Sequence, residues 1–273
     1  MKNSNPVTPV AAGTLLSGAA QRDGALELAV DDSWLQGRSW YGGVQLALAI
    51  KAARQAHGGD DPIRSLHATF IGPIGQEAPA TATAEVIRAG RSVTHMRATV
   101  RQGDRIAFEC TAIFGASRET EARLDSDADT NLGPEKAFRL KFMPGITPNC
   151  VQHYDMRWAR GMPPFSGADD PRATIFARPA DEDATFDETE FLALTDVIPP
   201  PVISIMHKPS PVSSMNVALE LIRPEVIFGT RQFVRFESEL HDTHSGYAWQ
   251  TAKMYDEAGT LLAIAHQSVA VFG

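Results

Sequence analysis

A carboxylate at Asp196 stands near the apolar side of a predicted helix, one turn beyond Leu192. Carboxylates serve in proteins as general acids and bases. A buried carboxylate needs hydrogen-bond or charged partners, because burying it unpaired costs free energy. Its position alone favours a simpler interpretation, in which Asp196 ends the helix and hydrogen-bonds the following loop.

An amide at Gln267 is a second polar group in apolar surroundings. On a strand, Gln267 shares its face with Ala265 and Val269, so the amide must find hydrogen-bond partners among small apolar side chains. The alternative is a surface glutamine, but the neighbours His266 and Ser268 can supply the polar face of that strand.

Ser214 is the third candidate and stands just before a strand that reaches Arg223. No GxSxG elbow surrounds it and no histidine lies at a spacing that marks a base, so the sequence does not predict a serine hydrolase triad. Strand alternation groups Ser214 with the polar Asn216 and Glu220, which leaves its orientation open and allows a serine without a role.

The sequence contains none of the common metal or cofactor motifs. The eight histidines form no HExxH or zinc-deaminase pattern, Cys110 and Cys150 form no CxxC pair, and the glycines form neither GxGxxG nor a phosphate loop. His241 and His244, beside Asp242, are predicted in a solvated turn. We therefore expect no metal site and no cofactor.

Composition limits the classes of function. The 273-residue chain is 43% hydrophobic, has a formal net charge of −8 and contains no run of lysines or arginines. This argues against a nucleic-acid surface, which needs a basic patch. No stretch is long enough to cross a bilayer, and no basic region precedes a sustained apolar run at the amino end. We expect a cytoplasmic protein that binds no membrane.

The elements that must position the three candidates begin with a long helix. Residues 42–56 are apolar on nearly every face over their first half, which predicts a mostly buried helix. Four strands joined by short turns follow at 63–71, 80–88, 92–101 and 105–114. One face of such a meander can cover the helix.

A second, shorter helix is predicted in the other half of the chain. Asp187, with Glu190 three residues later, has the spacing of a capping box. The helix runs to about Asp196, because the prolines at 199–201 forbid its continuation.

The strand pattern of the first half recurs in the second. Four matches keep their order with slowly increasing offsets: 65–73 with 216–224 (216 − 65 = 151), Glu85 with Glu237 (237 − 85 = 152), Gly103 with Gly259 (259 − 103 = 156) and 114–115 with 272–273 (272 − 114 = 158). Chance explains any one match, but not four in register. We predict an N-terminal unit at 1–116, a connection at 117–150 and a C-terminal unit at 151–273.

A helix followed by an antiparallel meander, twice over, predicts an α+β fold of the tandem hotdog type, each half an antiparallel sheet wrapped around a long buried helix. Five segments then carry a family resemblance: WYGG (40–43), SLHATFIGP (65–73), LALTDVIPP (192–200), SSMNVALELIRP (213–224) and YDEAGTLLAIAHQ (255–267). With these segments in this order, the chain resembles the double-hotdog, type II acyl-CoA thioesterases of the thioesterase-like superfamily over nearly its whole length.

The resemblance implies an activity and a site. It implies an enzyme of fatty acid metabolism that hydrolyses acyl-CoA to a free acid and CoA, through a water that Asp196 polarises and that Ser214 and Gln267 hold by hydrogen bonds. Subtracting the repeat offsets pairs Gln267 with Glu109 (267 − 158) and Ser214 with Ile63 (214 − 151). Because neither partner can play the same part, we expect one site in each chain.

Gly42 and Gly43 open the first predicted helix and are candidate substrate-binding residues. Free backbone N–H groups at a helix start suit a carbonyl oxygen that gains negative charge during a reaction. Close packing of the helix against the sheet explains two glycines equally well.

Two other functions stay open. One is a hotdog enoyl-CoA hydratase, although the glycine-containing Asp and His motif of those enzymes is not found. The other is a non-catalytic acyl-CoA-binding protein, since Asn216–Val217 stands where close type II relatives often have an acidic residue and a histidine. Acyl-CoA is the expected partner, and the outer face and edges of the sheet predict a homodimer or higher homo-oligomer.

Overall fold

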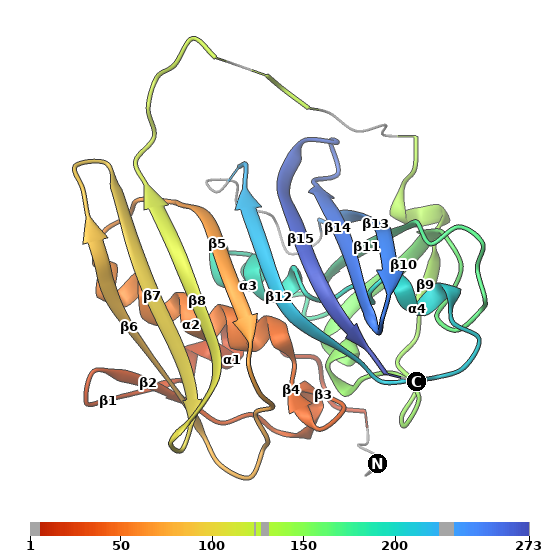
Figure 1. Cartoon of the computed structure of the whole chain (residues 1–273), viewed down its shortest axis with the longest axis horizontal. Helices are drawn as coiled ribbons and strands as arrows, with labels where there is room; N and C mark the ends of the chain where they lie inside the picture. The colour runs from red at the N-terminus through yellow and green to blue at the C-terminus, as the bar shows by residue number, and fades with distance from the viewer. Residues whose placement is uncertain (1–5, 123, 127–130, 224–231, 273) are drawn as a thin grey trace.

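The computed structural model of the chain describes residues 6–122, 124–126, 131–223 and 232–272. One antiparallel sheet of 13 strands forms a continuous layer through both halves of the chain, with the longest helix, α2 (Gly42–His57), behind its first half (Figure 1). This arrangement of sheet and helix confirms the predicted α+β fold of the tandem hotdog type.

The N-terminal half follows the predicted plan. Its elements are α1 (Ala12–Ser17), β1 (Ala20–Arg22), β2 (Ala25–Leu28), η1 (Asp32–Trp34), β3 (Leu35–Gln36), β4 (Ser39–Trp40), α2 (Gly42–His57), β5 (Ile63–Phe70), β6 (Ala80–Ala89), β7 (Val93–Gln102) and β8 (Arg105–Gly115). The long helix is buried along most of its length, and it ends where Gly58 adopts a left-handed conformation. The helix and the four long strands lie within about two residues of their predicted bounds.

The C-terminal half repeats the strands but shortens the helix. Its elements are η2 (Pro134–Lys136), β9 (Phe138–Leu140), η3 (Asn149–His153), β10 (Tyr154–Arg160), β11 (Ala173–Pro179), α3 (Glu188–Leu194), α4 (Val202–Ile205), β12 (Val212–Leu221), β13 (Val234–His244), β14 (Tyr247–Tyr255) and β15 (Leu261–Val271). Helix α3 has seven residues, against 16 in α2. The second half therefore contributes a much shorter helix to the core than the first half does.

The capping box at the start of α3 forms only in part. Asp187 is the N-cap, and its Oδ1 accepts a hydrogen bond of 3.0 Å from the backbone N–H of Glu190. The side chain of Glu190 does not complete the box, because its Oε2 accepts from the N–H of Gly13 in α1 at 2.8 Å. The helix also ends at Leu194 rather than near Asp196.

The two halves meet in the middle of the sheet, where β5 pairs with β12 (Figure 1). In this ladder Thr69 faces Asn216 and Ser65 faces Glu220. The β5–β8 ladder shifts its register after Ile63 and the β12–β15 ladder shifts after Ser214, so the same irregularity recurs at the predicted offset, 214 − 63 = 151. Pro224 and Gly273, at the ends of two predicted repeat segments, lie outside the described residues.

The predicted offset of 158 at the carboxyl end is wrong. Cys110 of β8 pairs with Ala68 of β5. Ala265 of β15 pairs with Leu219 of β12, and 68 + 151 = 219. Cys110 and Ala265 are therefore equivalent, at an offset of 265 − 110 = 155. Matching residue types could not reveal this register, because it is fixed by the ladder hydrogen bonds.

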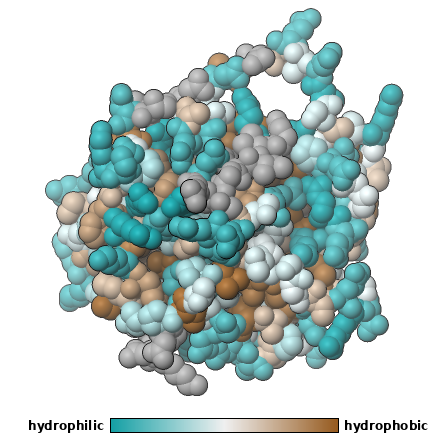
Figure 2. Space-filling view, turned by 180° about the vertical axis from the view of Figure 1, so that it is seen from behind, coloured by the Kyte–Doolittle hydropathy of each residue, from teal (hydrophilic) through white to brown (hydrophobic). Residues whose placement is uncertain are grey.

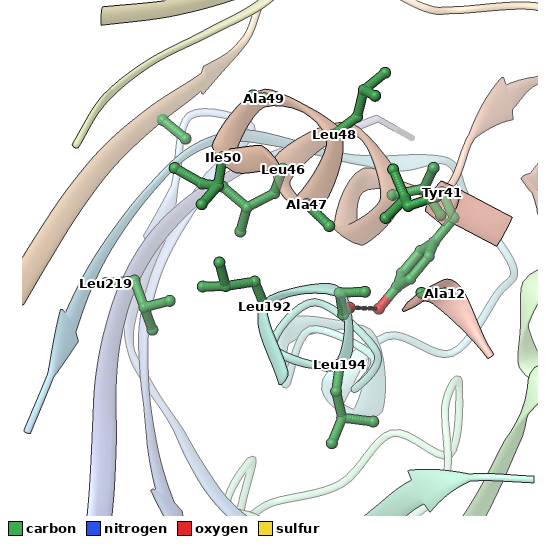
Figure 3. Packing of buried hydrophobic residues seen from close by; sticks show 14 of the residues in the cluster. Ala12, Tyr41, Leu46, Ala47, Leu48, Ala49, Ile50, Leu192, Leu194 and Leu219 are labelled. Atoms are coloured by element: carbon green, nitrogen blue, oxygen red, sulfur yellow. Dashed lines mark hydrogen bonds between the residues drawn. The ribbon is translucent and has the colours of Figure 1, made fainter. Parts of the chain in front are cut away.

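The core lies where α2 crosses α3 (Figure 3). Leu46, Ile50 and Leu192 are almost fully buried in this core cluster. The hydroxyl of Tyr41, the N-cap residue of α2, donates a hydrogen bond of 2.5 Å to the carbonyl of Ala193 in α3 (Figure 3). This contact fixes the start of α2 against the end of α3.

The face behind the sheet is mainly hydrophilic, with hydrophobic residues gathered in its lower middle (Figure 2). Within the described ranges, no helix combines the length and apolar character needed to span a membrane.

Candidate active site

A cavity of about 320 Å³ lies between the start of α2 and the strands β12 and β15. Asp196, Ser214, Gln267 and Gly42 all line it, although they come from distant parts of the sequence. Phe70 of β5 supplies part of its apolar wall. The structure therefore brings four of the five predicted site residues to one cavity.

Asp196 lies two residues beyond α3, in the turn that ends this helix. The backbone N–H of Val197 bonds the carbonyl of Leu194 at 3.0 Å, which closes the last turn. The amide of Gln267 and the backbone N–H of Gly43 both hydrogen-bond the carboxylate. The predicted alternative, an aspartate that merely bonds its following loop, does not describe these contacts.

Burial dominates the electrostatics of Asp196. It raises the pKa of this carboxyl from its usual value near 4 to about 7, while the bonds from Gln267 and Gly43 oppose the rise by stabilising the charged form. A carboxyl with this pKa exchanges its proton near neutral pH, as a general base must.

Ser214 and Gln267 are linked directly. The Nε2 of Gln267 donates a hydrogen bond of 2.8 Å to the Oγ of Ser214, and the same amide bonds Asp196. An amide nitrogen carries two N–H donors, so Gln267 can serve both neighbours. Carboxylate, amide and hydroxyl thus form one connected set.

A β-bulge explains the orientation of Ser214. The ladder between β12 and β15 shifts by one residue between Ser214 and Asn216, so simple alternation fails there. The same shift occurs in the first half between Ile63 and Ser65. Ile63 is fully buried, and its equivalent Ser214 likewise turns toward the interior.

The first half has apolar residues where the second half has the polar set. At the offset of 155, Gln267 corresponds to Ala112 and not to Glu109 as predicted. Ala112 is 1% exposed, and Ile63 occupies the place of Ser214. The prediction that the first half lacks the Ser and Gln pair still holds, now on structural grounds.

Gln250 belongs to the same network and was missed in the sequence. It faces Gln267 across the ladder between β14 and β15, and its Nε2 donates a hydrogen bond of 2.6 Å to the Oε1 of Gln267. The signal was present, because Gln250 shares strand parity with the apolar Ala248, Ala252 and Met254. This is the same pattern that pointed to Gln267.

The two glycines have different surroundings. A Cβ at Gly42 would collide with the carboxylate of Asp196 and the ring of Phe70, so only glycine lets α2 begin this close to the carboxylate. A Cβ at Gly43 would collide with the carbonyl of Ala193 in α3. Gly43 is thus needed for helix packing and its N–H bonds Asp196, whereas Gly42 lines the cavity.

Two other buried titratable groups do not line the cavity. Burial raises the pKa of Glu190 to about 7, although N–H groups at the start of α1 favour its charged form. Burial lowers the pKa of His153 to about 4, and its ring stacks on Trp34 at 4.0 Å. His153 Nδ1 also accepts a hydrogen bond from the N–H of Val10. Both side chains therefore accept hydrogen bonds from backbone N–H groups of the N-terminal segment.

No cluster of three or more His, Cys, Asp or Glu side chains that could hold a metal ion occurs in the described part of the chain. The carboxylate of Asp196 is bonded by an amide and a backbone N–H, which are donors and would compete with a cation.

Family models match most of the chain. The model for the acyl-CoA thioesterase N-terminal domain matches residues 30–115, and that for the acyl-CoA thioesterase C-terminal domain matches residues 125–271. The chain belongs to the acyl-CoA thioesterase family. The domain models therefore confirm the resemblance to type II thioesterases that was predicted from the sequence. A search of curated protein sequences gives no match.

Solved structures superpose on nearly the whole chain. A conserved protein of unknown function with a hot dog fold from Alicyclobacillus acidocaldarius has a TM-score of 0.84 at 23% identity, covering 95% of this chain and 97% of its own. The acyl-CoA thioesterase II TesB2 from Mycobacterium marinum has a TM-score of 0.73 at 16% identity, covering 94% and 96%. At these identities the likeness establishes the fold.

Proposed function

We propose that the chain hydrolyses acyl-CoA thioesters by direct attack of water, with Asp196 as the general base and Ser214 and Gln267 as the groups that hold the water. Membership of the acyl-CoA thioesterase family supports the reaction class. The hydrogen-bonded set of carboxylate, amide and hydroxyl on one cavity wall supports the assignment of residues.

The proposed reaction needs only one base. Asp196 takes a proton from the water while the water oxygen attacks the carbonyl carbon of the thioester, giving a tetrahedral intermediate. The C–S bond then breaks, the acid leaves with the new oxygen, and the proton on Asp196 passes to the sulfur of CoA. Positioning the water and accepting its proton are each worth large factors in rate.

The start of α2 can stabilise the oxygen that becomes negative. Gly42, the first residue of this helix, has an N–H with no partner inside the helix, and it lines the cavity beside Asp196. The positive end of the helix dipole adds to the effect. The N–H of Gly43 has a different task in this scheme, because it bonds the carboxylate of the base.

The observation that carries the proposal is the contrast between the two halves. The repeat places Ile63 and Ala112 where the second half has Ser214 and Gln267. The sheet is therefore stable with apolar residues at these positions, and the polar ones need another reason to be there.

The proposal is tested by free-thiol release from a panel of acyl-CoAs that differ in chain length, branching and aromatic character. We expect release with at least one class, at a rate that a chelator does not change. Binding without thiol release would favour the acyl-CoA-binding alternative, and hydration of an enoyl-CoA without thiol release would favour the hydratase.

A single-turnover experiment in H₂¹⁸O tests direct attack by water. We expect one labelled oxygen in the acid after the first turnover and no acyl group on the protein by mass spectrometry. An acyl adduct on Ser214, or label in the carboxyl of Asp196, would show a covalent intermediate instead.

A further inference from the structure

Gln250 is buried beside the proposed site, with 7% of its surface exposed. Its Nε2 donates to the Oε1 of Gln267 at 2.6 Å, so the oxygen end of Gln267 is occupied. The nitrogen end of Gln267 is then the end that meets Ser214 and Asp196. Two amides in a row, Gln250 and Gln267, thus donate in one direction, toward Ser214 and the carboxylate.

The direction of the Gln267 amide decides what Asp196 meets. Oxygen and nitrogen of an amide have nearly the same size, so packing alone does not distinguish the two orientations. A rotation of 180° would place the Oε1 of Gln267 against the carboxylate and remove a donor that stabilises its charge. The N–H of Gln250, which donates to the Oε1 of Gln267, opposes this rotation.

The other half of the molecule shows what this position looks like without a site. The pair of Gln250 and Gln267 across β14 and β15 corresponds to Met96 and Ala112 across β7 and β8. Met96 is fully buried and Ala112 is 1% exposed. Both residues of the second-half pair are amides, while both residues of the first-half pair are apolar.

We infer that Gln250 is a positioning residue, which holds the amide of Gln267 in the orientation that donates to Ser214 and Asp196. The inference rests on the proposed function, because it needs Gln267 to act in the reaction. Gln250 itself acts only through Gln267.

The first test is Gln250→Met, which copies the residue of the first half and removes the donor. We expect kcat to fall about tenfold, the worth of about one ordinary hydrogen bond, with KM almost unchanged. The midpoint of the pH–rate profile should move to higher pH, since Asp196 loses a stabilising donor for part of the time. A purely structural role would leave this midpoint where it is.

A double-mutant cycle separates action through Gln267 from direct action. In a Gln267→Ala background, Gln250→Met should have almost no further effect on kcat. Equal losses in both backgrounds would overturn the inference. If Asp196→Asn and Gln267→Ala each remove most of the turnover while Gln250→Met is neutral, the inference fails and the proposed function stands.

A second variant, Gln250→Glu, keeps the size of the side chain in case the methionine variant does not fold. A protonated glutamic acid can donate to Gln267, but the ionised form can only accept. We expect the turnover of Gln250→Glu to fall at the alkaline end of the pH–rate profile, where the turnover of the wild type stays constant. A turnover of this variant that stays constant at alkaline pH would contradict the inference.

Discussion

At the scale of single residues, Asp196 connects the geometry of the cavity with the chemistry proposed for it. Its carboxylate is bonded by the amide of Gln267 and the N–H of Gly43, and burial keeps its pKa near 7. The bonds place its oxygens, and the burial makes them basic enough to accept a proton from water at neutral pH.

Turnover should rise with pH through about 7. Asp196 acts as a base only when ionised, and burial has raised its pKa to about 7. We expect kcat/KM to increase about tenfold per pH unit well below this value and to level off above it. A stopped assay of thiol release between pH 5 and 9 measures the profile. A rate that is flat over this range, or that falls, would exclude Asp196 as the base.

Asp196→Asn should stabilise the folded protein at alkaline pH. The folded-state pKa of about 7 lies above the unfolded value near 4, so the wild type loses stability as pH rises through this window. Each pKa unit corresponds to about 1.4 kcal/mol, and asparagine carries no charge to bury. Thermal unfolding should show a larger gain in Tm for the variant at pH 8 than at pH 5.

The difference between wild type and variant isolates Asp196 in that experiment. Glu190, whose pKa is also raised, adds to the loss of stability with pH, and His153, whose pKa is lowered, opposes it. Both groups are present in both proteins and cancel in the difference. An equal Tm gap at both pH values would contradict the raised pKa of Asp196.

Strand parity singled out Gln267 and the family resemblance singled out Asp196, but neither could orient Ser214. The bulge before Asn216 exists only in the pairing of β12 with β15, and strand parity read along one strand does not show it. Gln250 could have been found by the parity that found Gln267. What the sequence could not show is that the two amides face each other across the ladder.

At the scale of the elements, the crossing of α2 and α3 sets the position of the carboxylate. Gly43→Ala should destabilise this crossing, because the new Cβ would collide with the backbone carbonyl of Ala193 and with the ring of Tyr41. Backbone cannot give way as a flexible side chain can, so we expect a loss of about 1–3 kcal/mol in the free energy of unfolding.

Gly72→Ala is the matched control for this change in denaturant unfolding. A Cβ at Gly72 has no described atom within 4 Å. We expect its unfolding midpoint to stay near that of the wild type. A Gly43→Ala protein with wild-type stability would mean that the two helices can separate without cost.

The elements were predicted unequally well for a physical reason. Helix α2 is a continuous apolar run that becomes polar toward its end, and short turns separate the first four long strands, so their bounds follow from the sequence. The length of α3 does not, since it depends on where Thr195 and Val197 close the last turn and where Glu190 finds α1 instead of its own cap. The contact of Glu190 with Gly13 joins segments that are far apart in the sequence.

At the scale of the whole molecule, two similar halves form one sheet but have diverged in chemistry. The ladder between β5 and β12 joins them in one continuous sheet. The first half contributes the long helix and Gly42, while the second contributes Asp196, Ser214 and Gln267. One cavity therefore needs both halves, which favours retention of the fused chain.

We predict a homo-oligomer that forms through the outer face of the sheet. The strands at the two edges of the sheet, β1 and β9, have three residues each and offer little backbone for another strand to pair with. The outer face carries large exposed side chains, with Trp249 38% and Tyr247 45% exposed. Light scattering at micromolar concentration should give at least a dimer.

Trp249→Glu should weaken that association, because a carboxylate replaces an exposed aromatic side chain without disturbing the core. Lys253→Gln, a change to another outward-facing residue of β14, serves as the matched control. A wild-type monomer at micromolar concentration would contradict the prediction, as would a Trp249→Glu variant that keeps the wild-type mass.

Thiol release by Asp196→Asn, measured beside the wild type and Glu109→Ala, tests the water-activating carboxylate most directly. Glu109, whose side chain is 39% exposed, pairs with Arg97 at 3.5 Å and does not line the cavity, so its loss should leave turnover unchanged. Asparagine keeps the shape of Asp196 but not its basic oxygen, and we predict a loss of about 10²- to 10⁴-fold in kcat with acyl-CoA binding retained. Near-normal turnover by Asp196→Asn would contradict the proposed mechanism.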